Sequence, residues 1–298
     1  MISKPSRGLV LVDKPAGMTS HDVVARLRRI YGQKRIGHAG TLDPGATGLL
    51  VIAIGNITRL LDYFQAKTKR YVGDVVFGIE TDSYDSDGTV VARSPVESLD
   101  LPRLDEAVSR LQGDISQLPP IVSALKLNGK RLYQYHRESL EVEIKPRQVR
   151  IDSIAYSTTD EPNVIHIEVV CSPGTYIRSI AHDLGAALEI GAHLRNLRRL
   201  ESGSFRVEDA YSLGDLTSDA IMDPISALSD FTVRGLNSEQ AARARNGSMV
   251  GLPDEGIDCV LLFDAGDGPL VNWDQLIGLY QRDSGDRFRA SVILPLIN

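Results

Sequence analysis

The chain of 298 residues has almost no cysteine and no long apolar stretch. Its two cysteines, Cys171 and Cys259, lie far apart and form no Cys-x-x-Cys pair, which argues against a disulfide framework and against a zinc site. No run of 18 apolar residues is present, so we expect no membrane-spanning helix. The first residues lack the apolar segment and the small-residue cleavage site of a signal peptide. These absences together predict a cytoplasmic protein.

The usual cofactor-binding motifs are absent as well. The sequence contains no G-x-x-x-x-G-K-[ST] phosphate loop, no H-E-x-x-H pair and no G-x-G-x-x-G after a predicted strand. We therefore expect neither a nucleotide cofactor nor a metal ion at the functional site.

The chain also lacks an overall excess of positive charge. Its net charge is −6 and its pI is about 5.6, which argues against a generally basic nucleic-acid-binding protein. Basic residues are nevertheless concentrated locally: residues 26–35 hold five and no acid, residues 126–150 hold seven against three glutamates, and residues 195–199 add three arginines. Either each cluster is a solvated face, or together they form a face for a polyanion.

The most informative segment that is present is residues 38–50, HAGTLDPGATGLL. Asp43-Pro44-Gly45 predicts a tight turn, because proline presets φ and glycine tolerates positive φ. The apolar run that follows predicts a buried strand. One carboxylate is thus held on a rigid loop at the end of a core strand, which is a way to position a nucleophile or a general base. The alternative is that Asp43 only caps a turn.

Local patterns predict several elements around this loop. Thr19 and Asp22 form a capping box for a helix that ends at Gly32, and residues 102–111 predict a second helix. Residues 163–171 alternate strictly between apolar and polar positions, and a helix follows from about Thr175 to Leu188. Tyr176 and Arg178 therefore lie at a strand-to-helix junction. Residues 56–64 predict a short helix, residues 80–89 a polar loop, and residues 114–150 a mobile basic arm.

Six ordered motifs, including residues 38–50, resemble those of one enzyme family, the tRNA pseudouridine-55 synthases or TruB family. The other motifs are residues 14–20 (KPAGMTS), 69–71 (KRY), 119–126 (PPIVSALK) together with 129–133 (GKRLY), 174–179 (GTYIRS) and 197–199 (LRR). The resemblance covers roughly residues 8–207. It implies an α+β fold with a large mixed-sheet catalytic domain over residues 1–225, which carries an RNA-binding arm at about 114–150. Residues 232–298 resemble a small β-rich PUA-like RNA-binding domain more loosely.

The resemblance also implies roles for individual residues. Asp43 would be the catalytic carboxylate and Arg178 its ion-pair partner. Tyr71 would stack on the extruded base and help remove the C5 proton, and Tyr176 would hydrogen-bond near it. The other implied contacts are an apolar wall (Leu197), a filler of the RNA stack (His38), pocket support and a phosphate contact (Lys14), and further phosphate contacts (Lys126, Lys130, Arg131 and Arg147).

The implied reaction converts the uridine at position 55, in the T-arm loop of tRNA, into pseudouridine. The sequence leaves open whether Asp43 attacks C1′, attacks C6 or removes a 2′ proton. We expect a monomer that needs no protein partner. Two alternatives remain: a guide-RNA-dependent synthase of the dyskerin type, and an RNA-folding helper without essential catalysis. The length of residues 126–150 favours the stand-alone enzyme over the first, and the presence of Asp43 favours an enzyme over the second.

Overall fold

A computed structural model describes residues 7–296, with the exception of residues 124, 128, 139, 141, 254, 267 and 271. The side chains of Lys126, Arg131, Tyr133, His136 and Ser218 also lie outside the description. The chain forms two compact units. The first comprises Met1–Pro44, Gly48–Gln65 and Ser202–Asn298, and the second comprises Gly45–Thr47 and Ala66–Glu201.

The N-terminal part of the first unit is built around a hairpin-like strand pair. Strand β1 (Gly8–Lys14) pairs antiparallel with β3 (Thr47–Ile54) along nearly its whole length, and β2 (Ile36–His38) pairs antiparallel with residues 52–54 of β3. Helix α1 (Ser20–Ile30) begins at the predicted capping box of Thr19 and Asp22. Its apolar side packs on these strands in one core that includes Val23, Leu27, Leu50 and Ile52.

The remainder of the first unit contains short helices and a five-stranded sheet. The order of that sheet is β14-β16-β17-β18-β15, which confirms a β-rich C-terminal region. The elements of this part are η1 (Gly55–Leu60), α2 (Leu61–Gln65), β13 (Phe205–Arg206), η2 (Val207–Asp209), η3 (Ser218–Ala220), α6 (Pro224–Ala227), β14 (Val233–Leu236), α7 (Ser238–Arg245), β15 (Val250–Gly251), β16 (Cys259–Asp264), η4 (Trp273–Gln275), β17 (Leu276–Ser284) and β18 (Arg287–Ile293).

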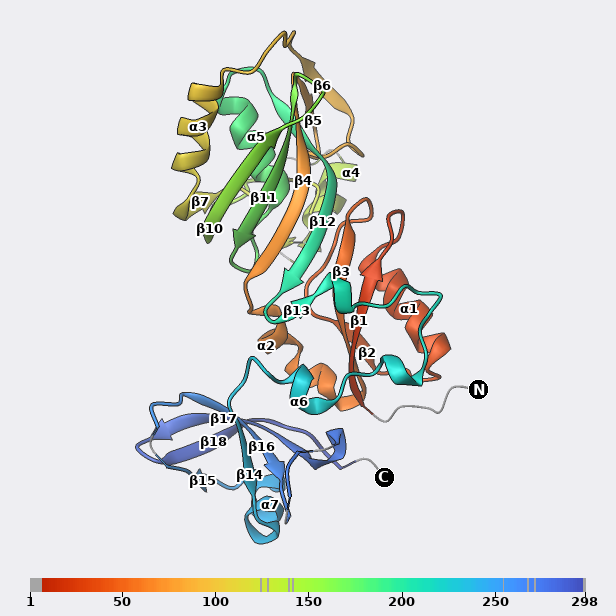
Figure 1. Ribbon diagram of the computed structural model, residues 1–298, viewed down its shortest axis with the longest axis vertical. Helices are drawn as coiled ribbons and strands as arrows, with labels where there is room; N and C mark the ends of the chain where they lie inside the picture. Colours follow the sequence, from red (N-terminus) through yellow and green to blue (C-terminus); the bar gives the residue numbers. More distant parts are fainter. Residues whose placement is uncertain are drawn as a thin grey trace. The chain divides into compact units, whose positions relative to one another are not determined.

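The second unit is a sheet covered on one face by helices α3 and α5 (Figure 1). Its strands follow the order β12-β4-β11-β10-β7. The elements are β4 (Lys69–Phe77), β5 (Ile79–Thr81), β6 (Val90–Arg93), α3 (Leu101–Arg110), β7 (Gly113–Gln117), β8 (Lys126–Leu127), β9 (Lys130–Arg131), α4 (Leu132–Arg137), β10 (Arg147–Thr158), β11 (Val164–Cys171), α5 (Ile177–Ala187) and β12 (Ala192–Ser202).

The predicted alternation of β11 is confirmed and explains where the core lies. Ile165, Ile167, Val169 and Cys171 are fully buried on the face that meets the two helices. Burial of each such apolar side chain contributes roughly 1.5–3 kcal/mol. The mixed α+β fold predicted from the sequence is therefore confirmed. Among the described residues, no helix is both long and apolar enough to cross a membrane.

Three local predictions need correction. The segment predicted as an arm, about residues 114–150, starts and ends inside the sheet, because β7 and the beginning of β10 pair over Gly113–Gln117 and Arg147–Ile151. Alternating apolar residues such as Ile115 and Val149 stabilise this pairing. The polar loop at residues 80–89 includes the end of β5, which pairs with β6. The short helix expected at 56–64 is a 3₁₀ helix over Gly55–Leu60 that continues as the α-helix over Leu61–Gln65.

Candidate active site

Lys14, a completely buried lysine, holds the loop that carries Asp43 through hydrogen bonds. Its Nζ donates hydrogen bonds to the carbonyl oxygens of Pro15 (2.9 Å), Met18 (2.7 Å) and Pro44 (3.1 Å). An ammonium group has three protons, and a buried one must use them to offset its lost hydration. This geometry favours the supporting role expected for Lys14 over a phosphate contact.

The start of helix α1 holds the same loop on the other side of Asp43. The Ser20 hydroxyl lies 3.1 Å from the carbonyl oxygen of Leu42 and accepts the Leu42 N–H at 2.9 Å. The N–H of Gly17 donates to the Pro44 carbonyl at 2.9 Å. The backbone is therefore held at the residue before Asp43 and at the residue after it. This is the rigid mounting that a reacting carboxylate requires.

His38 lies at the end of β2, where its ring meets that of His21 from α1. The two ring centroids are 5.5 Å apart and the planes are nearly perpendicular. His38 is half-buried and His21 is exposed. The structure thus brings His38 to the exposed side of α1 in the same unit as the Asp43 loop.

Tyr71 and Leu197 both pack against the core of the second unit. Both are partly buried and pack against the same core cluster, which also contains Ile177 at the start of α5. The aromatic ring and the leucine are presented on the face of the sheet that meets α5. An apolar clamp of this kind is what an extruded base needs.

Arg178 is 3% exposed, and its guanidinium group has defined partners within the second unit. Nη1 donates to the carbonyl oxygen of Ser83 at 2.8 Å and lies 3.2 Å from Oδ2 of Asp85, while Nη2 donates to the carbonyl oxygen of Val122 at 3.0 Å. Asp43 belongs to the first unit, so its pairing with Arg178 stays a prediction. Asp85 was not predicted, because its acidic segment reads as a solvated loop.

The turn that carries Asp85 also lies against the residue that follows Asp43 and Pro44. A Cβ atom on Gly45 would be only 2.8 Å from Oδ2 of Asp87. Oδ1 of Asp85 accepts the Asp87 N–H at 3.1 Å and the Ser83 hydroxyl at 2.6 Å. Glycine at position 45 therefore permits a close approach to this turn, and a side chain there would displace one of the two segments.

A stacked pair of rings supports the same turn. Tyr84 lies on His182 with the ring centroids 4.0 Å apart and the planes 13° apart. His182 follows Arg178 by one turn of α5, so both side chains project from the same side of the helix. Tyr84 has a φ of 63°, which is uncommon for a residue with a side chain. The stack connects α5 to the residues on either side of Tyr84, which both contact Arg178.

Tyr176 is positioned by an amide that the sequence did not reveal. The N–H of Tyr176 donates to Oε1 of Gln117 at 2.8 Å, and Nε2 of Gln117 donates to the Tyr176 carbonyl at 3.0 Å. Gln117 is 2% exposed and ends strand β7. Because Gln117 is distant in sequence, no local pattern could have identified this contact.

The four residues expected to contact phosphate differ in their surroundings. Arg147 is exposed at the start of β10 and forms no ion pair with any described residue, whereas Arg150 on the same strand pairs with Asp114 and Asp152. Lys130 pairs with Glu138 and lies 4.9 Å from the centre of the Tyr135 ring. The side chains of Lys126 and Arg131 lie outside the described residues.

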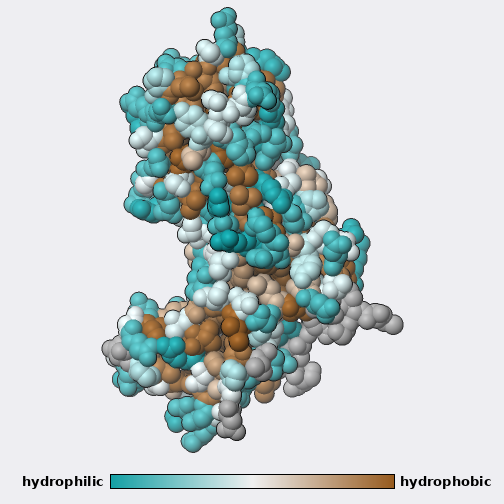
Figure 2. Space-filling view, in the orientation of Figure 1, coloured by the Kyte–Doolittle hydropathy of each residue, from teal (hydrophilic) through white to brown (hydrophobic). Residues whose placement is uncertain are grey.

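Hydrophilic residues cover much of the face shown in Figure 2, among smaller apolar patches, and charged residues are included among them. Many are paired, as in Arg103–Glu189 and Arg110–Glu106 on helix α3. Arg26, Arg29 and Lys34 on and after α1 are exposed, and none of them forms an ion pair with a described residue. Unpaired cations are available to a polyanion without first losing a partner.

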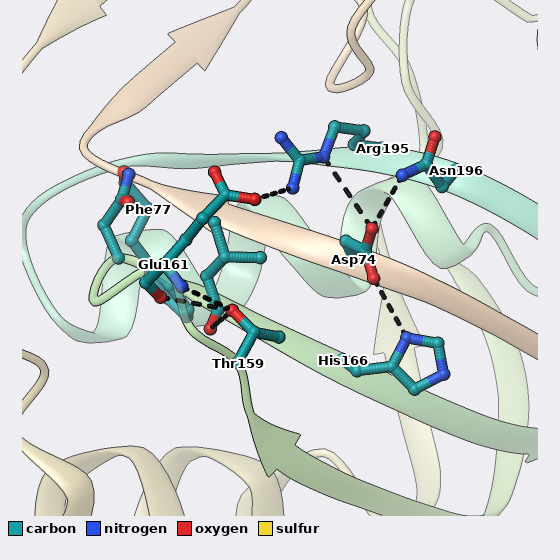
Figure 3. A network of polar contacts seen from close by, with 9 residues as sticks. Asp74, Phe77, Thr159, Glu161, His166, Arg195 and Asn196 are labelled. Carbon is teal, nitrogen blue, oxygen red and sulfur yellow. Dashed lines mark hydrogen bonds and ion pairs between the residues drawn. The ribbon is translucent and has the colours of Figure 1, made fainter.

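A polar network lies on the opposite face of the sheet from α5 (Figure 3). Oδ1 of Asp74 lies 2.9 Å from Nδ1 of His166, and Oδ2 accepts a hydrogen bond from Nδ2 of Asn196 at 2.7 Å. Arg195 lies beside them and pairs with Glu161 at 2.7 Å. Burial alone would raise the pKa of Asp74, but the hydrogen bonds from His166 and Asn196 hold it below its usual value.

Cys171 is a possible alternative nucleophile in the core of the second unit, and its surroundings make it unreactive. The residue is fully buried on β11. Burial raises the pKa of its thiol to about 11. Since the thiolate is the reactive form, this cysteine is inert at neutral pH.

Comparison with known proteins identifies the family to which this chain belongs. The TruB family pseudouridylate synthase N-terminal domain matches residues 28–177, and the tRNA pseudouridylate synthase B C-terminal domain matches residues 178–225. A tRNA pseudouridine synthase B of Mycobacterium bovis is 40% identical over 98% of this chain and 97% of its own length. The chain belongs to the TruB family. It is accordingly a pseudouridine synthase, an isomerase.

Other members and more distant structures extend this result. A tRNA pseudouridine synthase B of Mycolicibacterium paratuberculosis is 42% identical over 96% of this chain and 97% of its own length. One of Symbiobacterium thermophilum is also 42% identical, over 80% of this chain and 82% of its own length. The structure of an H/ACA ribonucleoprotein bound to a substrate RNA aligns with a TM-score of 0.71 over 96% of this chain and 84% of that chain, at 22% identity. An archaeal Nop10–Cbf5 complex aligns with the same score over 98% of this chain and 88% of that chain, also at 22% identity. At this identity the structures support the fold alone.

Proposed function

We propose that this TruB-family enzyme converts the uridine at position 55, in the T-arm loop of tRNA, into pseudouridine. One observation carries the proposal: Asp43 is mounted on a loop whose backbone is held at the preceding and the following residue by Ser20 and Lys14. The family relationship to proteins named tRNA pseudouridine synthase B supports tRNA as the substrate.

The reaction needs few catalytic groups, because it is an isomerisation: the product contains the same atoms as uridine, apart from one proton that is exchanged with the surroundings. The N1–C1′ bond breaks, the uracil turns, and C5 bonds to C1′; C5 then loses its proton and N1 gains one. A carboxylate can serve by attacking C1′, as in retaining glycosidases, by attacking C6, or by removing a 2′ proton. We assign this role to Asp43 and the removal of the C5 proton, directly or through water, to Tyr71.

We assign Arg178 to holding Asp43 in its ionised form. Arginine stays charged and binds carboxylates in a planar fork. Its contacts with Ser83, Asp85 and Val122 support this role. A guanidinium group that these contacts already hold in position loses little further conformational entropy when it binds a carboxylate.

Binding would be divided between the flipped base and the backbone. Tyr71, Tyr176 and Leu197 would enclose the uracil, and His38 would fill the space that the base leaves. Arg147, Lys130, Lys126 and Arg131 would contact phosphates, which gives affinity without sequence choice. Residues 232–298 would form a second, PUA-like RNA-binding module. We propose a monomer that acts without protein partners.

The guide-RNA-dependent alternative has weaker support. The relatives named tRNA pseudouridine synthase B are 40–42% identical to this chain, whereas the H/ACA structures are 22–24% identical. The experiment is tritium release from C5-labelled uridine in an unmodified tRNA transcript, with the purified protein alone. Release from the normal transcript and none from one with cytidine at position 55 is expected. Release that requires a guide RNA, or that is independent of position 55, would contradict the proposal.

A further inference from the structure

Strand β12 presents two leucines to the same core, although they are three residues apart. Leu194 is 1% exposed in the core of the second unit, and Leu197 packs against that core. Side chains of a regular strand alternate between the two faces, so residues three apart should point in opposite directions. The strand must therefore contain an irregularity between these leucines.

The irregularity lies at Asn196, whose φ is 57°. Asparagine adopts this left-handed conformation more readily than other residues with a side chain. An extra residue in this conformation is a β-bulge, which shifts the alternation by one position. The bulge therefore brings Leu197 to the face that carries Leu194.

Asp74 contacts Asn196 and the preceding residue, Arg195, from the outer face of the sheet (Figure 3). Its Oδ2 accepts a hydrogen bond from Nδ2 of Asn196 at 2.7 Å and lies 3.7 Å from Nε of Arg195. Its Oδ1 is bound to His166 at 2.9 Å, which fixes the carboxylate itself. Arg195 is also tied to Glu161 at 2.7 Å.

On the inner face the backbone of the bulge closely approaches Gly73 of β4, the residue before Asp74. A Cβ atom on Gly73 would be 3.3 Å from the carbonyl oxygen of Arg195 and 3.5 Å from Cα of Leu197. Gly73 is flanked on this face by Tyr71 and Val75, because alternate residues of β4 share a face. The position of Leu197 relative to Tyr71 is thus set by how the bulge lies on Gly73.

We propose that Asp74 and Asn196 are positioning residues that place Leu197 against the uracil. Neither touches the substrate; both act by fixing the bulge that turns Leu197 inward. The inference rests on the proposed function in one respect, the contact of Leu197 with the base.

The test compares two substitutions of Asn196 in the full-length protein. Asn196→Gly preserves the left-handed backbone, whereas Asn196→Val disfavours it. We expect the valine variant to lower the single-turnover rate on unmodified tRNA about tenfold and the glycine variant to stay within about twofold of wild type, because small displacements of a contact residue slow the reaction. Asp74→Ala should give a loss of about fivefold for the same reason. The tRNA dissociation constant should stay within about twofold in all three, since the phosphate contacts are unchanged.

Glu189→Val is the matched control, because Glu189 also has a left-handed backbone, with a φ of 62°, and an exposed ion pair with Arg103. It should lower the melting temperature without lowering the rate. The ¹³C-methyl resonances of Leu197 should shift in Asn196→Val and stay in place in Asn196→Gly, which tests the placement without an activity measurement. Wild-type rate and unshifted methyl resonances in Asn196→Val, or losses in Asn196→Gly equal to those of the valine variant, would overturn the proposal. If Leu197→Ala itself reacts at the wild-type rate, the proposed contact with uracil fails, and the methyl shifts still decide whether Asn196 positions Leu197.

Discussion

The loop around Asp43 and the end of the basic segment at Arg147 are built in opposite ways, although we assign both to the same RNA. Around Asp43, buried Lys14 and Ser20 fix the backbone through hydrogen bonds to neighbouring residues. At Arg147, an exposed side chain stands at the start of a strand without any ion pair to a described residue. Bond-making requires fixed positions, whereas a phosphate contact requires only an available charge.

This contrast predicts that substitutions in the two regions will change different quantities, the rate of the bound complex in one case and the affinity for tRNA in the other. Variants of the fixed region should lower the rate of the bound complex and leave affinity unchanged. Variants of the exposed basic region should lower affinity and its salt dependence and leave that rate unchanged.

The largest effect that we expect among the supporting residues is at Arg178. If Arg178 pairs with Asp43 as we propose, Arg178→Met removes one partner of a buried ion pair, which costs about 3 kcal/mol, or roughly a hundredfold in rate. Arg178→Lys keeps the charge but loses the planar fork and should lose only about tenfold. The methionine variant should also reach its best rate at higher pH, because a carboxylate without its counter-ion protonates more readily.

Single-turnover rates of both Arg178 variants from pH 5 to 9 test this prediction. Arg103→Met is the control, because Arg103 is an exposed arginine paired with Glu189. Equal losses for lysine and methionine, with the pH profile of wild type, would show that Arg178 does not tune Asp43.

A smaller effect is expected from paired and unpaired arginines on strand β10. Arg147→Gln should weaken tRNA binding several-fold and reduce the slope of log K against log salt by about 0.7–0.9, the value for one lost phosphate contact. Arg150→Gln should change neither, because Asp114 and Asp152 already neutralise Arg150. Filter binding at four salt concentrations is sufficient. Identical slopes for the two variants would mean that the ion pairs of Arg150 do not decide which of the two arginines contacts an RNA phosphate.

The ion pair of Lys130 with Glu138 allows a substitution that should strengthen tRNA binding instead of weakening it. If Lys130 must leave Glu138 to reach a phosphate, Glu138→Gln should tighten tRNA binding by about twofold, since an exposed ion pair contributes up to about 1 kcal/mol. Replacing Lys130 and Arg131 by alanine should weaken binding and flatten its salt dependence. Unchanged affinity in both variants would show that these residues face solvent in the complex.

A further effect concerns stability in acid rather than activity or binding. The pKa of Asp74 is lowered in the folded protein, so its stabilising contribution is present above its unfolded pKa of about 3.9 and is lost as the pH falls below it. Asp74→Asn should therefore be less stable than wild type by about 1 kcal/mol at pH 7 and equally stable near pH 2. Urea unfolding at both pH values, with the exposed Asp114→Asn as control, measures the difference. A gap of equal size at both pH values would contradict this account of Asp74.

The parts of the fold that were predicted correctly are those with short-range causes. The capping box at Thr19, the alternation of β11 and the turn before Arg178 each act within a few residues. The contact of Arg178 with Asp85, the clamp of Gln117 on Tyr176 and the bulge at Asn196 join segments that are distant in sequence. No local pattern encodes such pairs, because the partner is chosen by the way the sheet is assembled.

The ends of the basic segment show a related limit. Residues 114–117 and 147–150 carry too few apolar side chains to be recognised as strands alone, and their pairing with each other forms the edge of the sheet. Composition indicated the charge of this segment correctly but not its boundaries.

Asp43→Asn is the most direct test of the central claim, that a rigidly mounted carboxylate performs the isomerisation. The substitution keeps the shape of the side chain, and Lys14 and Ser20 hold the backbone on either side of Asp43 through hydrogen bonds of their own. The measurement is tritium release and tRNA affinity on the same preparation of the purified variant. We predict no detectable release, with a dissociation constant within about twofold of wild type, because binding depends on phosphate contacts and stacking. A turnover rate within about tenfold of wild type would contradict the claim, since loss of the only reacting carboxylate must cost far more than that.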